Sequence, residues 1–186
     1  MSRGFAVAGA IAAVVVGCAL STGGASAADR GCTRASVPAA AATLAQPDRS
    51  VLCLVNRERR ARGLAALRAS RTLARAARSH SRDMVARDYF SHVSRGGTGI
   101  RQRLVGSGYL RNGRQVATVG ETITWAPPGP AAAPAPLVRS FMNSSGHRAV
   151  LLSRGYREIG IGLVQGAPVA RPGAGSVTLT ITFGRR

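Results

Sequence analysis

The stretch S-V-T-L-T-I-T-F, residues 176–183, alternates a hydroxyl side chain with an apolar one at every position. Because successive side chains of a β-strand point to opposite faces of a sheet, this strict alternation predicts a strand. Residues 157–164 alternate more loosely around Gly160 and Gly162, and they predict a second strand. Residues 166–175, which include two prolines, are the loop of a long hairpin. The C-terminal part of the chain therefore predicts antiparallel β-structure.

Upstream of these strands the pattern favours helices. Residues 48–63 predict the first helix, with Asp48 or Ser50 as its N-cap and Gly63 as its end. The other elements that we expect are a helix at 70–88 capped by Ser70, a short helix at 98–105, a strand at 116–125, a helix from about Pro136 and a short helix at 147–152. Helices at the front and antiparallel strands at the back predict an α+β layered domain.

The helix at 70–88 carries a histidine on its apolar stripe. The stripe consists of Leu73, Ala76, Ala77, His80 and Met84. Ser81 and Asp83 lie next to His80, but neighbours within one helical turn point in different directions and cannot form a Ser-His-Asp triad. We therefore predict that His80 lies at the edge of the core, holds a loop carbonyl and is not catalytic.

The first 27 residues predict a signal peptide. Arg3 is a short basic region, residues 5–20 are apolar, and residues 25–27, A-S-A, form a small-residue cleavage site. The apolar run is shorter than the roughly 20 residues that a membrane-spanning helix needs. The sequence V-V-G-C ending at Cys18 resembles a bacterial lipoprotein cleavage box. We expect secretion with no transmembrane segment in the mature chain, and a lipid anchor at Cys18 is the alternative.

Cleavage after Ala27 leaves two cysteines, Cys32 and Cys53. An even count in an oxidising compartment predicts a disulfide between them. Their separation is wider than the close pairs that zinc sites use. Residues 28–47 are rich in small side chains and predict a flexible tether, which the disulfide would staple to a domain at 48–186.

The chain is strongly basic. All 26 of its basic residues are arginines, and seven acids leave a formal charge of +19. Such a charge permits binding to nucleic acid or to anionic lipid or wall polymer. The arginines are scattered, however, and aromatic residues that could stack on bases make up only 4% of the chain. We expect attraction to an anionic envelope surface and no nucleic-acid recognition.

Three ionisable side chains stand at the edges of apolar segments. They are His92 at the end of Y-F-S-H, Glu121 within G-E-T, and His147 after the polar turn of S-F-M-N-S-S-G-H-R-A-V-L-L. Core packing requires none of them at these positions. We therefore predict that the three side chains meet in one site. Two imidazoles in one cleft would lower at least one histidine pKa.

Six segments of the chain occur together and in the same order in one protein family. They are L-V-N-R-E-R-R-A-R-G-L (54–64), H-S-R-D-M (80–84), Y-F-S-H (89–92), G-E-T (120–122), S-S-G-H-R (144–148) and Y-R-E-I-G-I-G (156–162). On these segments, residues 50–184 resemble the CAP superfamily (cysteine-rich secretory, antigen 5, pathogenesis-related 1) in its bacterial secreted form. The resemblance implies a three-layer α-β-α sandwich with a central antiparallel sheet.

The resemblance also implies a cleft. In this family the cleft carries two histidines and two acids, and some members bind zinc or another divalent ion there. By motif, His92 and His147 match the histidines, and Glu121 matches the first glutamate. The second glutamate has no counterpart, and Ser144 lies in the region where it is expected. The resemblance thus implies a cleft of His92, Glu121 and His147 with Ser144 beside them.

These observations predict a monomeric, secreted binding module whose ligand, a lipid, a glycan or a protein, stays open. His92 and His147 are candidate zinc ligands, and Glu121 would be a third ligand or the general base to a bound water. The alternative function is a zinc-dependent hydrolase, of peptidase or esterase type, that uses these three residues. The competing structural interpretation is a hydrogen-bonded cluster that only holds two loops together.

Overall fold

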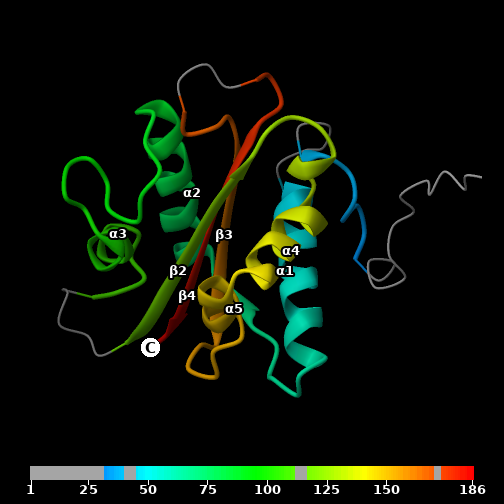
Figure 1. Cartoon of the computed structure of the whole chain (residues 1–186). Coiled ribbons are helices and arrows are strands. Elements are labelled where there is room, and N and C mark those ends of the chain that lie inside the picture. Colours follow the sequence, from blue (N-terminus) through cyan, green and yellow to red (C-terminus); the bar gives the residue numbers. More distant parts are fainter. Residues whose placement is uncertain (1–31, 40–44, 112–116, 170–172) are drawn as a thin grey trace, which may run out of the picture.

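A four-stranded sheet runs through the middle of the molecule, with helices on both of its faces (Figure 1). The computed structural model describes residues 32–39, 45–111, 117–169 and 173–186. The expected signal peptide, and Cys18 with it, lies outside the described residues. The elements are α1 (Ala45–Arg60), β1 (Arg68–Ala69), α2 (Arg71–Ala86), α3 (Ile100–Gly106), β2 (Thr118–Ala126), the 3-10 helix η3 (Pro130–Ala132), α4 (Pro134–Asn143), α5 (Ser145–Leu151), β3 (Glu158–Gln165) and β4 (Val177–Arg185).

The strands lie in the order β1-β3-β4-β2. β4 pairs antiparallel with β2 and β3, so that Glu121 stands opposite Thr182 and Ile161 opposite Ile181. The expected α+β layers are confirmed. β1, however, pairs in parallel with β3, so the sheet is mixed and not wholly antiparallel. A strand of two residues shows no alternation, and for that reason the sequence pattern did not predict it.

One face of the sheet carries the main apolar core. The side chains of Val177, Leu179, Ile181 and Phe183 on β4 are fully buried, and they form one cluster with residues of α1 and α4. Burial of an apolar side chain of this size stabilises the fold by about 1.5–3 kcal/mol. Figure 1 shows α1 and α4 side by side over this face.

The opposite face is polar, and α2 lies directly on it. The alternate β4 side chains, Thr178, Thr180 and Thr182, are as buried as the apolar ones. Thr182 Oγ1 donates to the Leu73 carbonyl of α2 at 3.0 Å. On β3, a Cβ added at Gly160 would lie 2.2 Å from the α2 backbone. Glycine at this position therefore lets α2 approach the sheet closely. This packing holds α2 in place, and the loop that carries His92 follows α2 in the chain.

The helix starts agree with the predictions at α2 and differ at α1. Ser70 caps α2, as expected from the sequence. α1 begins at Ala45, earlier than predicted, and neither expected cap residue acts as one. Asp48 pairs with Arg78 of α2, and Ser50 bonds to the chain segment that precedes the helix. Both side chains make tertiary contacts in place of local caps, which local sequence rules do not foresee.

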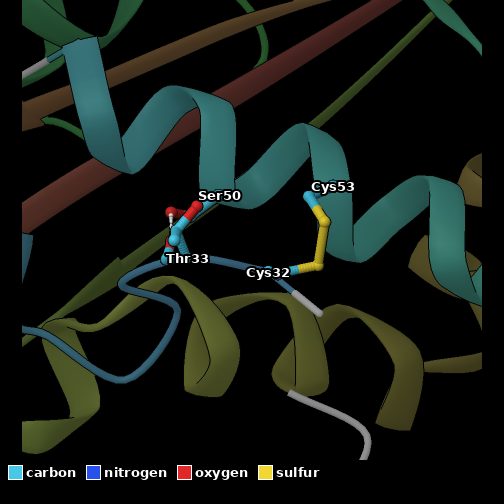
Figure 2. Close-up of a disulfide and its surroundings, with 4 residues drawn as sticks. All are labelled: Cys32, Thr33, Ser50 and Cys53. Carbon is cyan, nitrogen blue, oxygen red and sulfur yellow. Dashed lines mark hydrogen bonds between the residues drawn. A yellow bond between two sulfur atoms is a disulfide. The ribbon is translucent and has the colours of Figure 1, made fainter. Parts of the chain in front are cut away.

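The predicted disulfide is present. Figure 2 shows Cys32 joined to Cys53 of α1, with their Cα atoms 5.7 Å apart. Beside the disulfide, Ser50 Oγ donates to the Thr33 carbonyl at 2.6 Å. The covalent bond and the hydrogen bond together attach the N-terminal segment to one side of α1.

Residues 32–39 pack into the domain, so the prediction of a tether over 28–47 is wrong for this part of the chain. Ala35 and Ala39 are 3% and 0% exposed, and both belong to the main apolar cluster. The Ala35 carbonyl accepts a hydrogen bond from the Ala135 N–H of α4 at 2.8 Å. Small side chains, which suggested a tether, here allow the segment to lie close against the helices.

Candidate functional site

Glu121 is the buried centre of the candidate site. It lies on β2, and its side chain is 3% exposed. A buried carboxylate is costly unless donors and an opposite charge compensate it. Arg103 supplies both, since its Nη2 atom lies 2.9 Å from each carboxylate oxygen. Glu121 is therefore held in an ion pair.

Arg103 projects from α3, and its own side chain is 8% exposed. Its guanidinium also donates to the carbonyls of Thr98 at 2.8 Å and of His92 at 3.0 Å. These bonds tie the loop before α3 to the sheet. The sequence does not distinguish Arg103 as a site residue, because one arginine in R-Q-R-L-V resembles the others that are scattered along the chain. The sequence offers only an indirect indication of Arg103, namely that a buried acid such as Glu121 needs a cationic partner.

His92 lies between the buried acid and solvent. Its Nδ1 atom is 2.9 Å from Glu121 Oε1, and because a carboxylate only accepts, Nδ1–H is the donor. The His92 side chain is 53% exposed. In the neutral ring this hydrogen bond leaves the lone pair on Nε2 for a ligand. The structure thus brings together two of the three side chains that were predicted to meet, His92 and Glu121.

His147 lies in the first turn of α5, with its ring edge-on to Phe141 at a centroid distance of 5.2 Å. Burial lowers the pKa of His147, and the charge of His92 lowers it further. The contact that the structure gives for the His147 ring is with Phe141, and the meeting of His147 with His92 and Glu121 in one site stays a prediction.

His80 is fully buried and has a structural role. Because a carbonyl only accepts, His80 Nε2–H donates to the Ser91 carbonyl, at 2.9 Å. Burial lowers the pKa of His80, and the charge of Arg103 adds to this effect. Ser81 donates instead to the Gly162 carbonyl on β3. The prediction that His80 holds a loop carbonyl is confirmed.

Ser144 stands at the junction between α4 and α5. It is half-buried and occupies the N-cap position of α5, where its backbone carbonyl accepts from the Arg148 N–H at 2.8 Å. Its side chain makes no capping hydrogen bond. Its place among the cleft residues stays a prediction.

The ionisation of Glu121 decides what the site can do. Burial acts to raise the pKa of Glu121, but the hydrogen bond from His92 and the charges of Arg103 and His80 outweigh it, so the pKa lies below the ordinary 4.5. A general base works best when its pKa lies near the working pH. Glu121 is therefore a poor proton acceptor at neutral pH, and it is suited to orienting His92.

The residues do not fit a zinc centre with three protein ligands. Within the described residues, no group of three or more His, Cys, Asp and Glu side chains is placed to hold a metal. Both oxygens of Glu121 accept from Arg103, whose positive charge also opposes a metal cation. Through its hydrogen bond with His92 Nδ1, Glu121 would instead orient the His92 ring if that ring held an ion. The donors that remain are the imidazoles of His92 and His147.

Comparisons with known proteins place the domain among its relatives. A family model described as CAP, the cysteine-rich secretory protein family, matches residues 52–177. The uncharacterized protein YkwD of Bacillus subtilis (strain 168) is 31% identical over 124 residues, which cover 66% of this chain and 44% of that protein. The uncharacterized membrane protein YlbC of the same organism is 35% identical over 117 residues, which cover 62% of this chain and 31% of that protein. The chain thus spans less than half the length of these relatives.

A solved structure shares the fold. It is that of an extracellular protein containing a SCP domain from Bacillus anthracis str. Ames, with a TM-score of 0.60 and 24% identity. The match covers 75% of this chain and 40% of that one. Among the helices of the described residues, none is long and apolar enough to cross a membrane.

Proposed function

The chain belongs to the cysteine-rich secretory protein (CAP) family, and on this premise we propose that it acts outside the cell as a binding module rather than as an enzyme. The observation that carries the proposal is the pairing of Glu121 with Arg103. This ion pair removes the acid as a base and as a metal ligand. It leaves the imidazoles of His92 and His147 as the groups that a ligand meets.

Two exposed apolar side chains in the same loop as His92 support a binding role. Phe90 and Val93 flank it in the same loop and are 46% and 50% exposed. Each imidazole can donate or accept a hydrogen bond, and the two apolar side chains offer contact area. This combination suits a partner that carries both apolar and hydrogen-bonding groups. The net charge of +19 adds a general attraction to anionic envelope material.

Retention on an isolated bacterial cell-wall fraction, at about 0.15 M salt, tests the proposal. We expect the mature chain to be retained, and His92→Gln/His147→Gln to lose most of the retention without a change in fold. Arg139→Gln, which removes one exposed charge on α4, is the matched control and should behave like the wild type. No retention of the wild type, or equal retention of the double variant, would contradict a binding role for the two histidines.

The second candidate function is weak metal binding by His92 and His147. The observation that favours it is the Nδ1–H hydrogen bond from His92 to Glu121, the arrangement in which a carboxylate supports a ligating histidine. Calorimetric titration with Zn²⁺ should show weak binding that His147→Gln abolishes. Wild-type protein that releases no heat with Zn²⁺ would rule this candidate out. Hydrolysis of peptide or ester substrates that Glu121→Gln abolishes would contradict the main proposal instead.

A further inference from the structure

A cavity of about 170 Å³ lies where the loop after α1 meets the loop after α5. Both loops lie at the same end of the molecule, at the bottom of Figure 1. The candidate site residues His92, Glu121 and His147 do not belong to the lining. The lining consists of Arg59 on α1, Gly63, Leu64 and Ala65 in the loop that follows, and Arg154 and Arg157 between α5 and β3. Three guanidinium groups therefore border one small cavity.

Arg59 is a buried cation that ties the two loops to α1, and it is only 1% exposed. Its Nε–H donates to the Ala65 carbonyl at 3.0 Å, and Nη1 donates to the carbonyls of Leu151 at 2.7 Å and Ser153 at 3.0 Å. Carbonyls have a dipole but no net charge, so they orient the guanidinium without neutralising it. Burial lowers the pKa of Arg59, and the charge of Arg157 lowers it further. Both effects oppose the charged form of Arg59, and a bound anion would offset them.

Two N–H groups of the Arg59 guanidinium remain for a ligand. An arginine side chain has five N–H donors, and the three on Nε and Nη1 are those that the carbonyls accept. The two on Nη2 have no acceptor among the described residues. Nη2 is not one of the side-chain atoms of these residues that are both sealed from solvent and unpaired, so it keeps contact with solvent. Because Arg59 lines the cavity, Nη2 is the donor that it presents to a ligand there.

The positive charge at the cavity is uncompensated. Among the described residues, no acidic side chain lines it, and none forms an ion pair with one of the three arginines. The acids that adjoin these arginines in the sequence have other partners. Glu58 pairs with Arg62 at 2.7 Å, and Glu158 accepts a hydrogen bond from Tyr109 at 2.7 Å. The cavity therefore favours an anion over a neutral or cationic ligand.

The arrangement favours a phosphate over a carboxylate. Guanidinium groups bind phosphate oxygens through charged hydrogen bonds, often two at a time. The three groups come from two separate segments, α1 and the loop before β3. A tetrahedral phosphate presents oxygens in several directions, whereas a carboxylate presents two oxygens in one plane. A phosphate monoester also carries a charge of about −1.5 to −2 at pH 7, and it compensates more of the positive charge than the single charge of a carboxylate does.

We propose that Arg59, Arg154 and Arg157 form a binding site for a phosphate group, either of a phosphate ester or of the free ion. Arg59 Nη2 is the buried donor, and the two exposed arginines supply the outer charges. The volume of about 170 Å³ equals that of between five and six water molecules at roughly 30 Å³ each, which admits a phosphate group. The site goes beyond the proposed function and does not depend on it, because it uses none of the residues His92, Glu121 and His147.

An NMR titration of the ¹⁵N-labelled mature chain, at about 0.15 M salt, tests this site through the amides of Gly63, Leu64 and Ala65. The probes are inorganic phosphate and glycerol 3-phosphate, with acetate and glycerol as controls that lack the phosphate group. We expect saturable shifts with phosphate. Saturation with inorganic phosphate alone would support a site for the free ion, and saturation with glycerol 3-phosphate would support one for phosphate esters. No saturable shift with either probe, or equal shifts with acetate, would overturn the proposal.

Two variants and a matched control make the result specific. Arg154→Gln/Arg157→Gln leaves Arg59 in place and should weaken phosphate binding at least about tenfold, because one charged hydrogen bond is worth a factor of this size. Arg82→Gln/Arg139→Gln removes the same charge from exposed positions outside the lining and should bind like the wild type. Arg59→Lys has three donors for the three carbonyls and none left, so it should also weaken binding. If Arg154→Gln/Arg157→Gln binds phosphate like the wild type, or the control weakens binding equally, the proposal is wrong.

Discussion

The inner and outer residues of the candidate site differ in burial and in charge pairing. On the inner side, the side chains of Glu121, Arg103 and His80 are at most 8% exposed, and the two charges neutralise each other. On the outer side, His92 is 53% exposed and His147 is half-buried. A buried charge is expensive to disturb, whereas an exposed imidazole exchanges partners easily. The inner side is therefore suited to a scaffold role, and the proposed function assigns ligand contact to the outer side.

The largest change in the free energy of unfolding is expected when the inner side loses its cation, Arg103. Arg103→Met leaves the Glu121 carboxylate buried without its partner, and removal of one member of a buried pair typically destabilises by about 3–5 kcal/mol. Urea denaturation of the variant and the wild type measures the difference. The double variant Arg103→Met/Glu121→Met is the control and should regain most of the lost stability, because no buried charge remains. A loss below about 1 kcal/mol in the single variant would mean that the inner side is not a scaffold.

Removal of the disulfide, which lies away from the candidate site, should lower stability without affecting the site. Cys32 and Cys53 are 21 residues apart, and the loop-entropy model assigns such a closure about 3 kcal/mol. Ala35 and Ala39 are buried, so the segment that the disulfide attaches is part of the folded core. We therefore expect Cys32→Ala/Cys53→Ala to lose most of this free energy of unfolding, measured by thermal unfolding. The loss should be larger than it would be if residues 32–39 formed a flexible tether. Zn²⁺ titration of the variant should match the wild type. A negligible loss would restore the tether interpretation for residues 32–39.

The stability of the protein should fall on acidification. The folded-state pKa values of His80 and His147 are lowered, mainly by burial, so the unfolded chain takes up protons first. Stability is then complete above about pH 6.5 and declines below it. Glu121, whose pKa is lowered, adds a further loss only below about pH 4.5. Asp48 opposes the decline between about pH 4 and 6, because burial raises its pKa to about 6 and its protonation favours the folded state.

Urea denaturation at several pH values between about 5 and 7 checks this prediction. His80→Gln can keep a donor for the Ser91 carbonyl but does not titrate, so it should flatten the decline. His147→Gln should flatten it less, because His147 is less buried than His80. A decline that is the same in both variants as in the wild type would show that neither histidine couples to folding.

The smallest effect is expected on the outer side. His92→Gln removes an exposed partner of Glu121 while Arg103 stays in place, so stability should change by at most about 1 kcal/mol. The same variant should lower retention on the cell-wall fraction. A loss of stability as large as that of Arg103→Met would erase the distinction between the two sides.

Much of the fold could be predicted because its signals are local. The strict alternation of residues 176–183 and the capping position of Ser70 depend on a few neighbouring residues each. β1 and the packing of residues 32–39 could not be predicted in this way. The two-residue strand β1 exists only because β3 lies beside it. The alanines of residues 32–39 give the same sequence pattern whether they form a flexible tether or pack tightly against helices.

The candidate site was predictable on its outer side and less so on its inner side. His92, Glu121 and His147 stood out as ionisable residues at the edges of apolar segments, in the order of a known family. Arg103 lies in none of the family segments, and nothing in the neighbouring sequence distinguishes it from the other arginines. Its partner Glu121 is 18 residues away in the chain, and they meet only because α3 packs beside β2.

The central claim is that Glu121 is a paired anion of the scaffold and not a base, and its pKa in the intact protein tests this most directly. A pH titration followed by carbon NMR of the Glu121 side-chain carboxyl gives the value, with Glu121→Gln to assign the signal. The ion pair with Arg103 and the hydrogen bond from His92 predict a pKa below 4.5. A pKa raised toward neutrality would contradict the claim and return Glu121 to the role of a general base.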